Sequence, residues 1–198
     1  MIIEAAKPHD CDALVPLIFS SGPVTFDYVF LGAAEDFLRA TLPKPSNSFS
    51  HGAHWVARET AKGNACASIS LYTRAEHDAR HNGNLGALLN WGGWRSPLII
   101  VKGLKVEALI PPPPSGTLHI AHLGVAPGLR NRGLGEQLVH YAESKARAEN
   151  IGTLSLDVSA QNPRAQALYE RLGFSVKHTN ISKVAVLADH YYMEKAVR

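Results

Sequence analysis

The chain has 198 residues, of which 45% are hydrophobic and 19% charged, and its formal net charge is +3 with histidines neutral. That length suits a single domain with a sizeable core, and the modest charge without a lysine or arginine run argues against a dedicated nucleic-acid binder. Cys11 and Cys66 form no disulfide framework, and we see neither a secretory signal nor an apolar run of the roughly 20 residues that span a membrane, so we expect a cytoplasmic protein without a membrane segment.

The N-terminal part alternates short apolar segments with turn signals. Asp10 is placed to cap the first helix, and Ser20-Ser21-Gly22-Pro23 breaks it. Lys62-Gly63-Asn64 suits a hairpin turn, because Gly and Asn accept a positive φ. The expected elements are a strand at 1–6, helices at 12–19 and 32–40, a loop at 43–50, and strands at 54–58 and 65–72.

Residues 74 to 116 are predicted to form a helical insertion. Ser96-Pro97 is a typical helix start, with Ser as the cap and Pro at the first helical position. The run Pro111–Pro114 ends the insertion, since proline cannot continue a helix. Apolar residues follow Ser96 at helical spacing, namely Leu98, Val101, Leu104 and Ala108.

The second half predicts strands and helices in alternation. After a strand at 117–125, the apolar residues Leu134, Leu138 and Ala142 recur every four positions, which indicates an amphipathic helix of about 15 residues. A strand at 153–159, a helix from Asn162-Pro163 to Leu172, and strands near 174–179 and 190–196 complete the chain. This order, with short connections, predicts an α+β fold whose central sheet is covered by helices.

A stretch rich in glycine and arginine, Gly128–Gly135, joins the strand at 117–125 to that amphipathic helix. It is not a P-loop, because Leu134-Gly135 stand where lysine and a hydroxyl residue are required. It is not a dinucleotide fingerprint, because Leu138 occupies the third glycine position. A helix start with unpaired N–H groups and two arginines suits a pyrophosphate, but an ordinary glycine turn fits the spacing alone equally well.

Two motifs together resolve this choice. Arg130-x-x-Gly133-x-Gly135, preceded by Leu123-Gly124-Val125, resembles the acyl-coenzyme A signature of the GNAT superfamily of N-acyltransferases. The later segment Asn162 to Phe174, with Asn, Ala, Tyr and Gly-Phe in the family's order, resembles the segment that follows it there. The resemblance is strong over Thr117–Phe174, whereas the N-terminal elements are compatible and carry no specific motif.

The resemblance implies one GNAT-like domain over 1–198, with a mixed, partly splayed central sheet that opens where two central strands part. It implies an N-acetyltransferase that moves an acetyl group from acetyl-CoA to a primary amine by direct attack on the thioester. The alternative is a catalytically silent, CoA-binding sensor or structural module of the same fold. For either reading, the resemblance implies the same coenzyme-binding residues, namely Leu123, Gly124, Val125, Arg130, Asn131, Arg132, Gly133, Leu134, Gly135, Asn162, Ala165 and Tyr169.

The same resemblance gives candidates for proton transfer. Tyr169 matches the family's helical tyrosine, whose hydroxyl lies near the coenzyme sulfur, and is the candidate acid for the leaving thiolate, with packing in the core as the alternative. The backbone N–H of Val125 or its neighbour is the expected oxyanion donor. His119 and His122 are candidate bases because histidine titrates near neutral pH, with a water chain as the alternative. In a regular strand these histidines face opposite sides, and a bulge near Leu123 would alter that.

Other features are assigned by simpler arguments. His77 and His81 lie four apart without a third ligand nearby, so we expect no metal. The acceptor is a small-molecule or peptide amine bound by the early helices and the insertion, and we expect no nucleic-acid or membrane partner. The resemblance also raises homodimerisation, which no motif here fixes. Several aromatic residues fit either a substrate pocket or the core, with the core favoured: Phe26, Tyr28, Phe30, Trp91 and Trp94.

Overall fold

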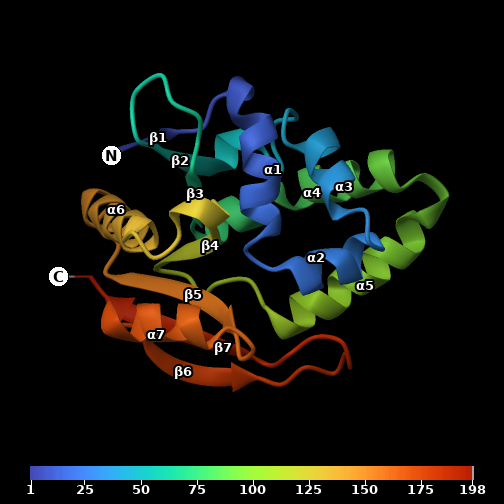
Figure 1. Cartoon of the computed structure of the whole chain (residues 1–198). Helices are drawn as coiled ribbons and strands as arrows, with labels where there is room; N and C mark the ends of the chain where they lie inside the picture. The colour runs from blue at the N-terminus through green and yellow to red at the C-terminus, as the bar shows by residue number, and fades with distance from the viewer. Residues whose placement is uncertain (198) are drawn as a thin grey trace.

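A sheet of seven strands runs through the molecule, with helices packed on both of its faces (Figure 1). The computed structural model describes residues 1–197. Its strands are β1 (Ile2–Ala5), β2 (His54–Arg58), β3 (Ala67–Tyr72), β4 (Thr117–Val125), β5 (Thr153–Ser159), β6 (Ser175–Asn180) and β7 (His190–Ala196). Its α-helices are α1 (Cys11–Phe19), α2 (Pro23–Phe30), α3 (Ala34–Thr41), α4 (Arg74–Gly92), α5 (Ser96–Leu109), α6 (Leu134–Ala148) and α7 (Pro163–Arg171).

The sheet is mixed and splits in its middle, as the resemblance implied. The strand order is β1-β2-β3-β4-β5-β7-β6, and β4 and β5 are parallel while the other neighbours are antiparallel. The β4–β5 ladder ends at the pair Ile120↔Leu156. Beyond it β4 stays paired with β3 as far as Val125, and β5 stays paired with β7 as far as Ser159. The two strands therefore part and leave a gap between their carboxyl ends.

Each face of the sheet carries its own hydrophobic core. On one face, Leu138, Val139 and Ala142 of α6 pack with apolar side chains of β3, β4 and β5. On the other face, helices α1 to α5 pack around Phe37 and Val56. Figure 1 shows α2 to α5 gathered to the right of the strands and α6 to their left. Side chains along a strand point alternately to the two faces of the sheet. We call the face covered by α6 the α6 face, and the face covered by α1 to α5 the α1 face.

Helix α2 was not predicted. Gly22-Pro23 does end α1, but Pro23 also begins a new helix, because proline is favoured in the first turn. Aromatic and apolar residues of α2 pack into the α1-face core rather than alternating as in a strand, and Leu31 ends the helix with a φ of 57°. The helices expected at 12–19 and 32–40, the hairpin formed by β2 and β3, and the later strands and helices are confirmed within a few residues.

Two predicted caps are wrong in their details. Asp10 precedes α1 but makes no side-chain cap bond; its carboxylate instead accepts from the Nη2 of Arg58 at 2.7 Å and from the Lys7 N–H at 2.9 Å. Ser96 lies inside the first turn of α5, after the N-cap Arg95, and its Oγ donates to the Leu88 carbonyl at 3.2 Å. In both cases a partner from another element takes the side chain away from the helix terminus.

Within residues 1–197 no single helix is both long and apolar enough to cross a membrane. The helical segments Pro8–Phe19 and Pro23–Phe30 reach the required length and composition only when taken together, and they are bent by 103° at their junction.

Candidate active site

The last residues of β4 present a free backbone edge to the gap. The Ala126 N–H donates to the Cys66 carbonyl at 2.9 Å, toward β3. Because the N–H and C=O of one trans peptide point in opposite directions, the Val125 carbonyl points to the side that β5 has left. Arg130 Nε donates to that carbonyl at 3.1 Å. An extended ligand could therefore pair with this edge as an additional strand.

Gly124 is required where helix α1 crosses β4. A Cβ at this position would lie 2.1 Å from the Leu17 carbonyl oxygen and 2.8 Å from its carbon. The neighbouring side chains of Leu123 and Val125 turn to the α6 face and pack against its core. Glycine therefore lets α1 lie directly against the strand at the point where the gap begins.

The glycine-rich stretch forms a loop of unpaired donors before α6. Asn131 and Gly133 adopt left-handed backbone conformations, with φ of 62° and 78°, and Gly133 is the N-cap of α6 without a side-chain cap bond. Within residues 1–197, the N–H groups of Asn131, Arg132 and Gly133 have no hydrogen-bond partner. Together with the first turn of α6 and the exposed Arg132, they form a site suited to an anion.

Three elements carrying predicted coenzyme residues meet beside this loop. A Cβ at Gly135, in the first turn of α6, would lie 3.4 Å from Leu168 of α7 and 3.7 Å from Leu123 of β4. The Asn162 side chain caps α7 by accepting from the Ala165 N–H at 3.1 Å, and Ala165 packs against the α6-face core. The predicted coenzyme residues thus surround one end of the β4–β5 gap.

Tyr169 approaches from the α6 face. It is 8% exposed and its ring packs edge-on to Phe174, with centroids 5.7 Å apart. Burial raises the pKa of Tyr169 to about 12, so its hydroxyl is protonated at neutral pH. A protonated phenol can give a proton to a leaving thiolate, as expected for a general acid.

Strand β4 contains a bulge, the feature that could bring both histidines to one face, and both lie on the α1 face. Ser68 pairs with Gly124 but Ser70 pairs with Ala121, so β4 contains one extra residue between these pairs. His122 lies in this bulge with a φ of 49°. His119 stands beside Tyr72 on the α1 face, and His122 stands on the same face, between His54 of β2 and Phe26 of α2.

A chain of hydrogen bonds fixes the protonation of His119. The Thr117 hydroxyl donates to the Pro114 carbonyl at 3.0 Å, and so the Ser155 hydroxyl must donate to Thr117 Oγ1 at 3.2 Å. With the Ser155 hydrogen used, His119 Nδ1 must be the donor in its 3.0 Å bond to Ser155 Oγ. Burial lowers the pKa of His119 to about 3. His119 is therefore neutral at pH 7, with its lone pair on Nε2.

A second chain fixes His122 in the same way. His54 Nδ1 lies 2.9 Å from the Ser50 carbonyl, which can only accept, so His54 carries its hydrogen there. Its Nε2 then accepts from His122 Nδ1 at 3.2 Å, leaving the lone pair of His122 on Nε2. Burial lowers the pKa of His54 to about 4 and of His122 to about 3. Sequence reasoning missed His54, because its partner lies 68 residues away.

Asp157 is a further candidate that the sequence analysis did not name. It follows Leu156, the last β5 residue paired with β4, and its Oδ2 lies 3.9 Å from His119 Nε2. Asn180 donates to Oδ1 at 3.4 Å, whereas the buried Oδ2 has no hydrogen-bond partner within residues 1–197. Burial raises the pKa of Asp157 to about 7. Its sequence signal is a single acidic residue in an otherwise uncharged strand.

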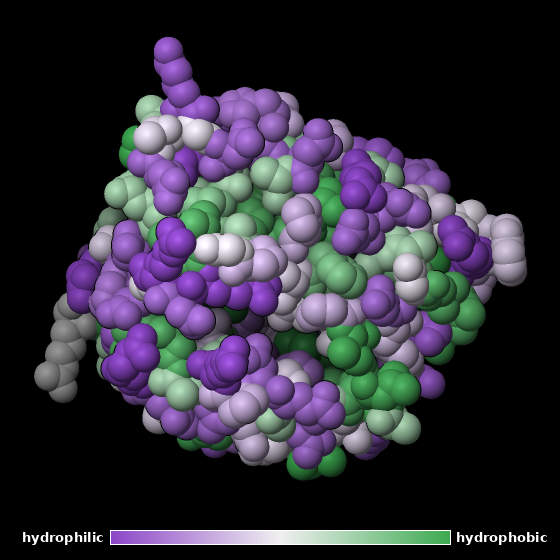
Figure 2. All heavy atoms as spheres, viewed as in Figure 1, coloured by the Kyte–Doolittle hydropathy of each residue, from purple (hydrophilic) through white to green (hydrophobic). Residues whose placement is uncertain are grey.

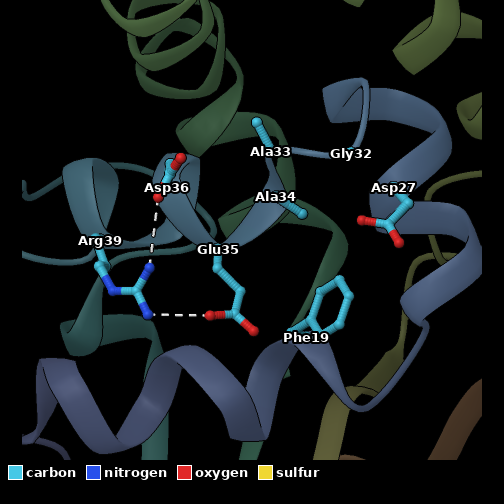
Figure 3. A pocket seen from close by; sticks show the side chains of 8 residues that line it. All are labelled: Phe19, Asp27, Gly32, Ala33, Ala34, Glu35, Asp36 and Arg39. Atoms are coloured by element: carbon cyan, nitrogen blue, oxygen red, sulfur yellow. Dashed lines mark hydrogen bonds and ion pairs between the residues drawn. The ribbon is translucent and has the colours of Figure 1, made fainter.

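The surface is hollowed in two places of interest. Figure 2 shows a hollow near the centre of the visible face, close to the end of β5 in Figure 1. A separate pocket of about 320 Å³ lies among α1, α2 and α3, where Arg39 pairs with Glu35 and Asp36 (Figure 3). The ring of Phe19, which lines this pocket, lies 6.3 Å from that of Phe26.

The aromatic residues of the early helices are mainly core. Phe26 and Phe30 are 8% and 3% exposed, and their rings contact Phe49. Trp91 packs against Phe30 and Phe37, whereas Trp94 is 90% exposed. Phe26 and Phe49 also flank His122, with ring centroids 5.8 and 5.5 Å away, so this part of the core borders the candidate site.

Comparison with known proteins agrees with this geometry. The family model described as "Acetyltransferase (GNAT) family" matches residues 30–174. A mycothiol acetyltransferase of Beutenbergia cavernae is 43% identical over 63 residues, which cover 32% of this chain but only 21% of that protein. A crystal structure of an acetyltransferase is similar over 100% of both chains, with a TM-score of 0.68 and 17% identity. The structure of an N-acetyltransferase from Staphylococcus aureus Mu50 covers 98% of this chain and 100% of its own, with a TM-score of 0.65 and 14% identity. The chain belongs to the acetyltransferase (GNAT) family.

Proposed function

We propose that this chain is an N-acetyltransferase that moves the acetyl group of acetyl-CoA to a primary amine by direct attack on the thioester. The observation that carries the proposal is the free edge of β4, which runs directly into a loop of unpaired N–H groups. Such an edge and loop complement the two ends of a coenzyme A molecule, namely its amide-containing arm and its pyrophosphate. Family membership and the mycothiol acetyltransferase relative support acetyl as the group that is transferred.

The coenzyme contacts follow from this arrangement. The pyrophosphate binds the N–H groups from Asn131 to Gly135, with the side chains of Arg130 and Arg132 adding charge. The Arg130 N–H itself donates to the Pro127 carbonyl at 3.4 Å. The pantetheine arm pairs with the backbone of Leu123 and Val125, which requires Arg130 to release or share the Val125 carbonyl. Asn162 and Ala165 hold the start of α7 against this site.

The reacting groups approach from the two faces of the sheet. Tyr169, on the α6 face, protonates the departing sulfur, and the Val125 N–H stabilises the oxyanion. The acceptor amine comes from the α1 face, where both histidines hold their lone pairs on Nε2. Alkyl amines are mostly protonated at neutral pH, so a group on this face must also accept a proton before the nitrogen can attack.

The test combines coenzyme binding with turnover. Purified protein mixed with acetyl-CoA and a panel of small-molecule and peptide amines should release free thiol, measured with a thiol reagent. Gly135→Asp should weaken CoA binding at least about ten-fold in calorimetry, because it adds bulk and negative charge beside the phosphates. Gly103→Asp, on α5 where a Cβ meets nothing within 4 Å, is the control. Tight CoA binding without thiol release from any amine would instead support a silent coenzyme sensor.

A further inference from the structure

Two lone-pair acceptors face each other on the α1 face of the gap. His119 is fixed with its hydrogen on Nδ1, so its Nε2 carries a lone pair toward Asp157. Asp157 Oδ2 is buried, lies 3.9 Å from that nitrogen, and has no hydrogen-bond partner within residues 1–197. A buried acceptor without a donor is unfavourable, and more so when it is charged. Asp157 Oδ2 and His119 Nε2 would therefore both be satisfied by a ligand with at least two N–H or O–H donors.

We propose that Asp157 Oδ2 and His119 Nε2 form the seat of the acceptor's ammonium group, and that Asp157 takes the proton this ammonium must lose. This inference rests on the proposed function and names the residues that bind and activate its amine. A primary ammonium has three N–H donors, enough for both acceptors, and its charge complements the carboxylate.

The proposed ammonium seat lies at the border of the β4–β5 gap. Asp157 is the first β5 residue beyond the end of the β4–β5 ladder, so it borders the gap through which a thioester would reach the α1 face. Tyr72 of β3 packs against His119 with ring centroids 5.2 Å apart, and Tyr192 of β7 pairs with Asp157 across the sheet. In the described part of the chain no lysine or arginine pairs with Asp157. Burial raises the pKa of the Tyr72 phenol, and the guanidinium of Arg80, on α4, lies close enough to Tyr72 to oppose that rise.

The surrounding groups leave Asp157 poised to exchange a proton. The groups that face it are His119 on β4, Tyr72 on β3, Tyr192 on β7 and the Asn180 amide on β6. Desolvation outweighs the Asn180 hydrogen bond and sets the Asp157 pKa near 7, where a carboxylate is a better base than an ordinary exposed aspartate. The lone pair of His119 keeps the nitrogen oriented while the proton moves to Oδ2.

The proposed reaction moves the acetyl group from sulfur to nitrogen and releases one proton. The ammonium gives one proton to the Asp157 carboxylate and becomes a neutral amine. Its nitrogen forms a bond to the thioester carbonyl carbon, and the carbon–sulfur bond breaks with its electron pair on sulfur. The nitrogen loses a second proton, the sulfur gains one from Tyr169, and the second proton from nitrogen passes through solvent to restore the Tyr169 hydroxyl. Asp157 then returns its proton to solvent. The products are an amide, free coenzyme A thiol and one released proton.

Binding is tested without turnover by following the Asp157 carboxyl. The whole protein, labelled with carbon-13 at aspartate carboxyls, is titrated with pH in the presence of propylammonium chloride or tetramethylammonium chloride. Asp157→Asn identifies the resonance by its loss. Propylammonium should lower the Asp157 titration midpoint, because it stabilises the carboxylate; tetramethylammonium, which has no N–H, should not. Glu194→Gln removes a nearby carboxylate on β7 and should preserve the response. An unchanged midpoint with propylammonium would overturn the seat.

Turnover tests the proton transfer separately. Asp157→Asn should lower kcat/KM for propylamine at least about 100-fold at pH 7. For trifluoroethylamine, which is already neutral at that pH, the loss should be less than about ten-fold, since no proton has to be removed first. Equal losses for both amines would contradict the role as base. If the wild type acetylates no amine but Asp157 still responds to propylammonium, the seat stands and the proposed function fails.

Discussion

At the scale of single residues, Tyr169 carries the most specific role in the proposed chemistry. Tyr169→Phe removes only the hydroxyl, so coenzyme affinity should stay within about two-fold while turnover falls by about 100-fold. Thiol release and calorimetry measure the two quantities. Tyr141→Phe, on α6 at the edge of the same core, is the matched control. Turnover that survives in Tyr169→Phe would remove this residue from the acid role.

The ionised Asp157 carboxylate should lower the stability of the folded protein. Its folded pKa, about 7, lies above the usual value near 4 of an unfolded aspartate. The folded state therefore binds more protons between these values, and stability contributed by this group falls as pH rises from about 4 to about 7. Asp157→Asn should raise Tm relative to wild type at pH 8 and change it little at pH 4. The exposed Asp27→Asn is the control; an equal Tm difference at both pH values would contradict this account.

Sequence and structure agree most closely where the signal is local. The loop from Arg130 to Gly135 could be identified from the sequence, because its glycines, arginines and following helix are adjacent in the chain. Asp157 and His54 could not, because their significance depends on His119 and His122, which lie on other strands. The tautomers of both histidines are likewise set by distant hydroxyl and carbonyl groups. The proposed pyrophosphate loop is thus encoded in a continuous segment, whereas the proposed amine-binding pair is assembled by the sheet.

At the scale of secondary-structure elements, the crossing of α1 over β4 is the tightest contact near the gap. Gly124→Ala would place a methyl group against the Leu17 carbonyl, and helix or strand must shift. We expect a loss of about 1–3 kcal/mol in the free energy of unfolding, measured by urea denaturation. Gly128→Ala meets nothing within 4 Å and should change it by less than about 0.5 kcal/mol. Equal effects of the two substitutions would show that the close approach is relaxed in solution.

Elements were predicted well when their apolar period was long and poorly when it was short. Helix α6 has its apolar residues on one side, so its period was plain in the sequence. Helix α2 has only eight residues and is largely apolar, so its aromatic residues also fit the alternation of a strand. Asp10 was expected to cap α1, but Arg58, which is 48 residues away, binds its carboxylate. Tertiary partners decided both cases.

At the scale of the whole molecule, the two cores share one sheet and should unfold together. Phe37 and Leu138 are both fully buried, one in each core. Phe37→Ala should cost about 3–5 kcal/mol and Leu138→Ala about 2–5 kcal/mol. Far-ultraviolet circular dichroism and tryptophan fluorescence should report the same shifted midpoint for each variant. Separate transitions in either variant would mean that the α1 face and the α6 face fold independently.

The bulge at His122 makes the length of β4 as consequential as its composition. Before it, odd-numbered residues of the strand face α1; after it, even-numbered residues do. A regular strand of the same length would send His122 and Gly124 under α6 and press Leu123 and Val125 against α1. Deleting the extra residue would instead remove one position that faces α1 and leave the faces of the following residues unchanged. The bulge therefore decides which side chains of this segment meet α1 and which meet α6, without any change of residue type.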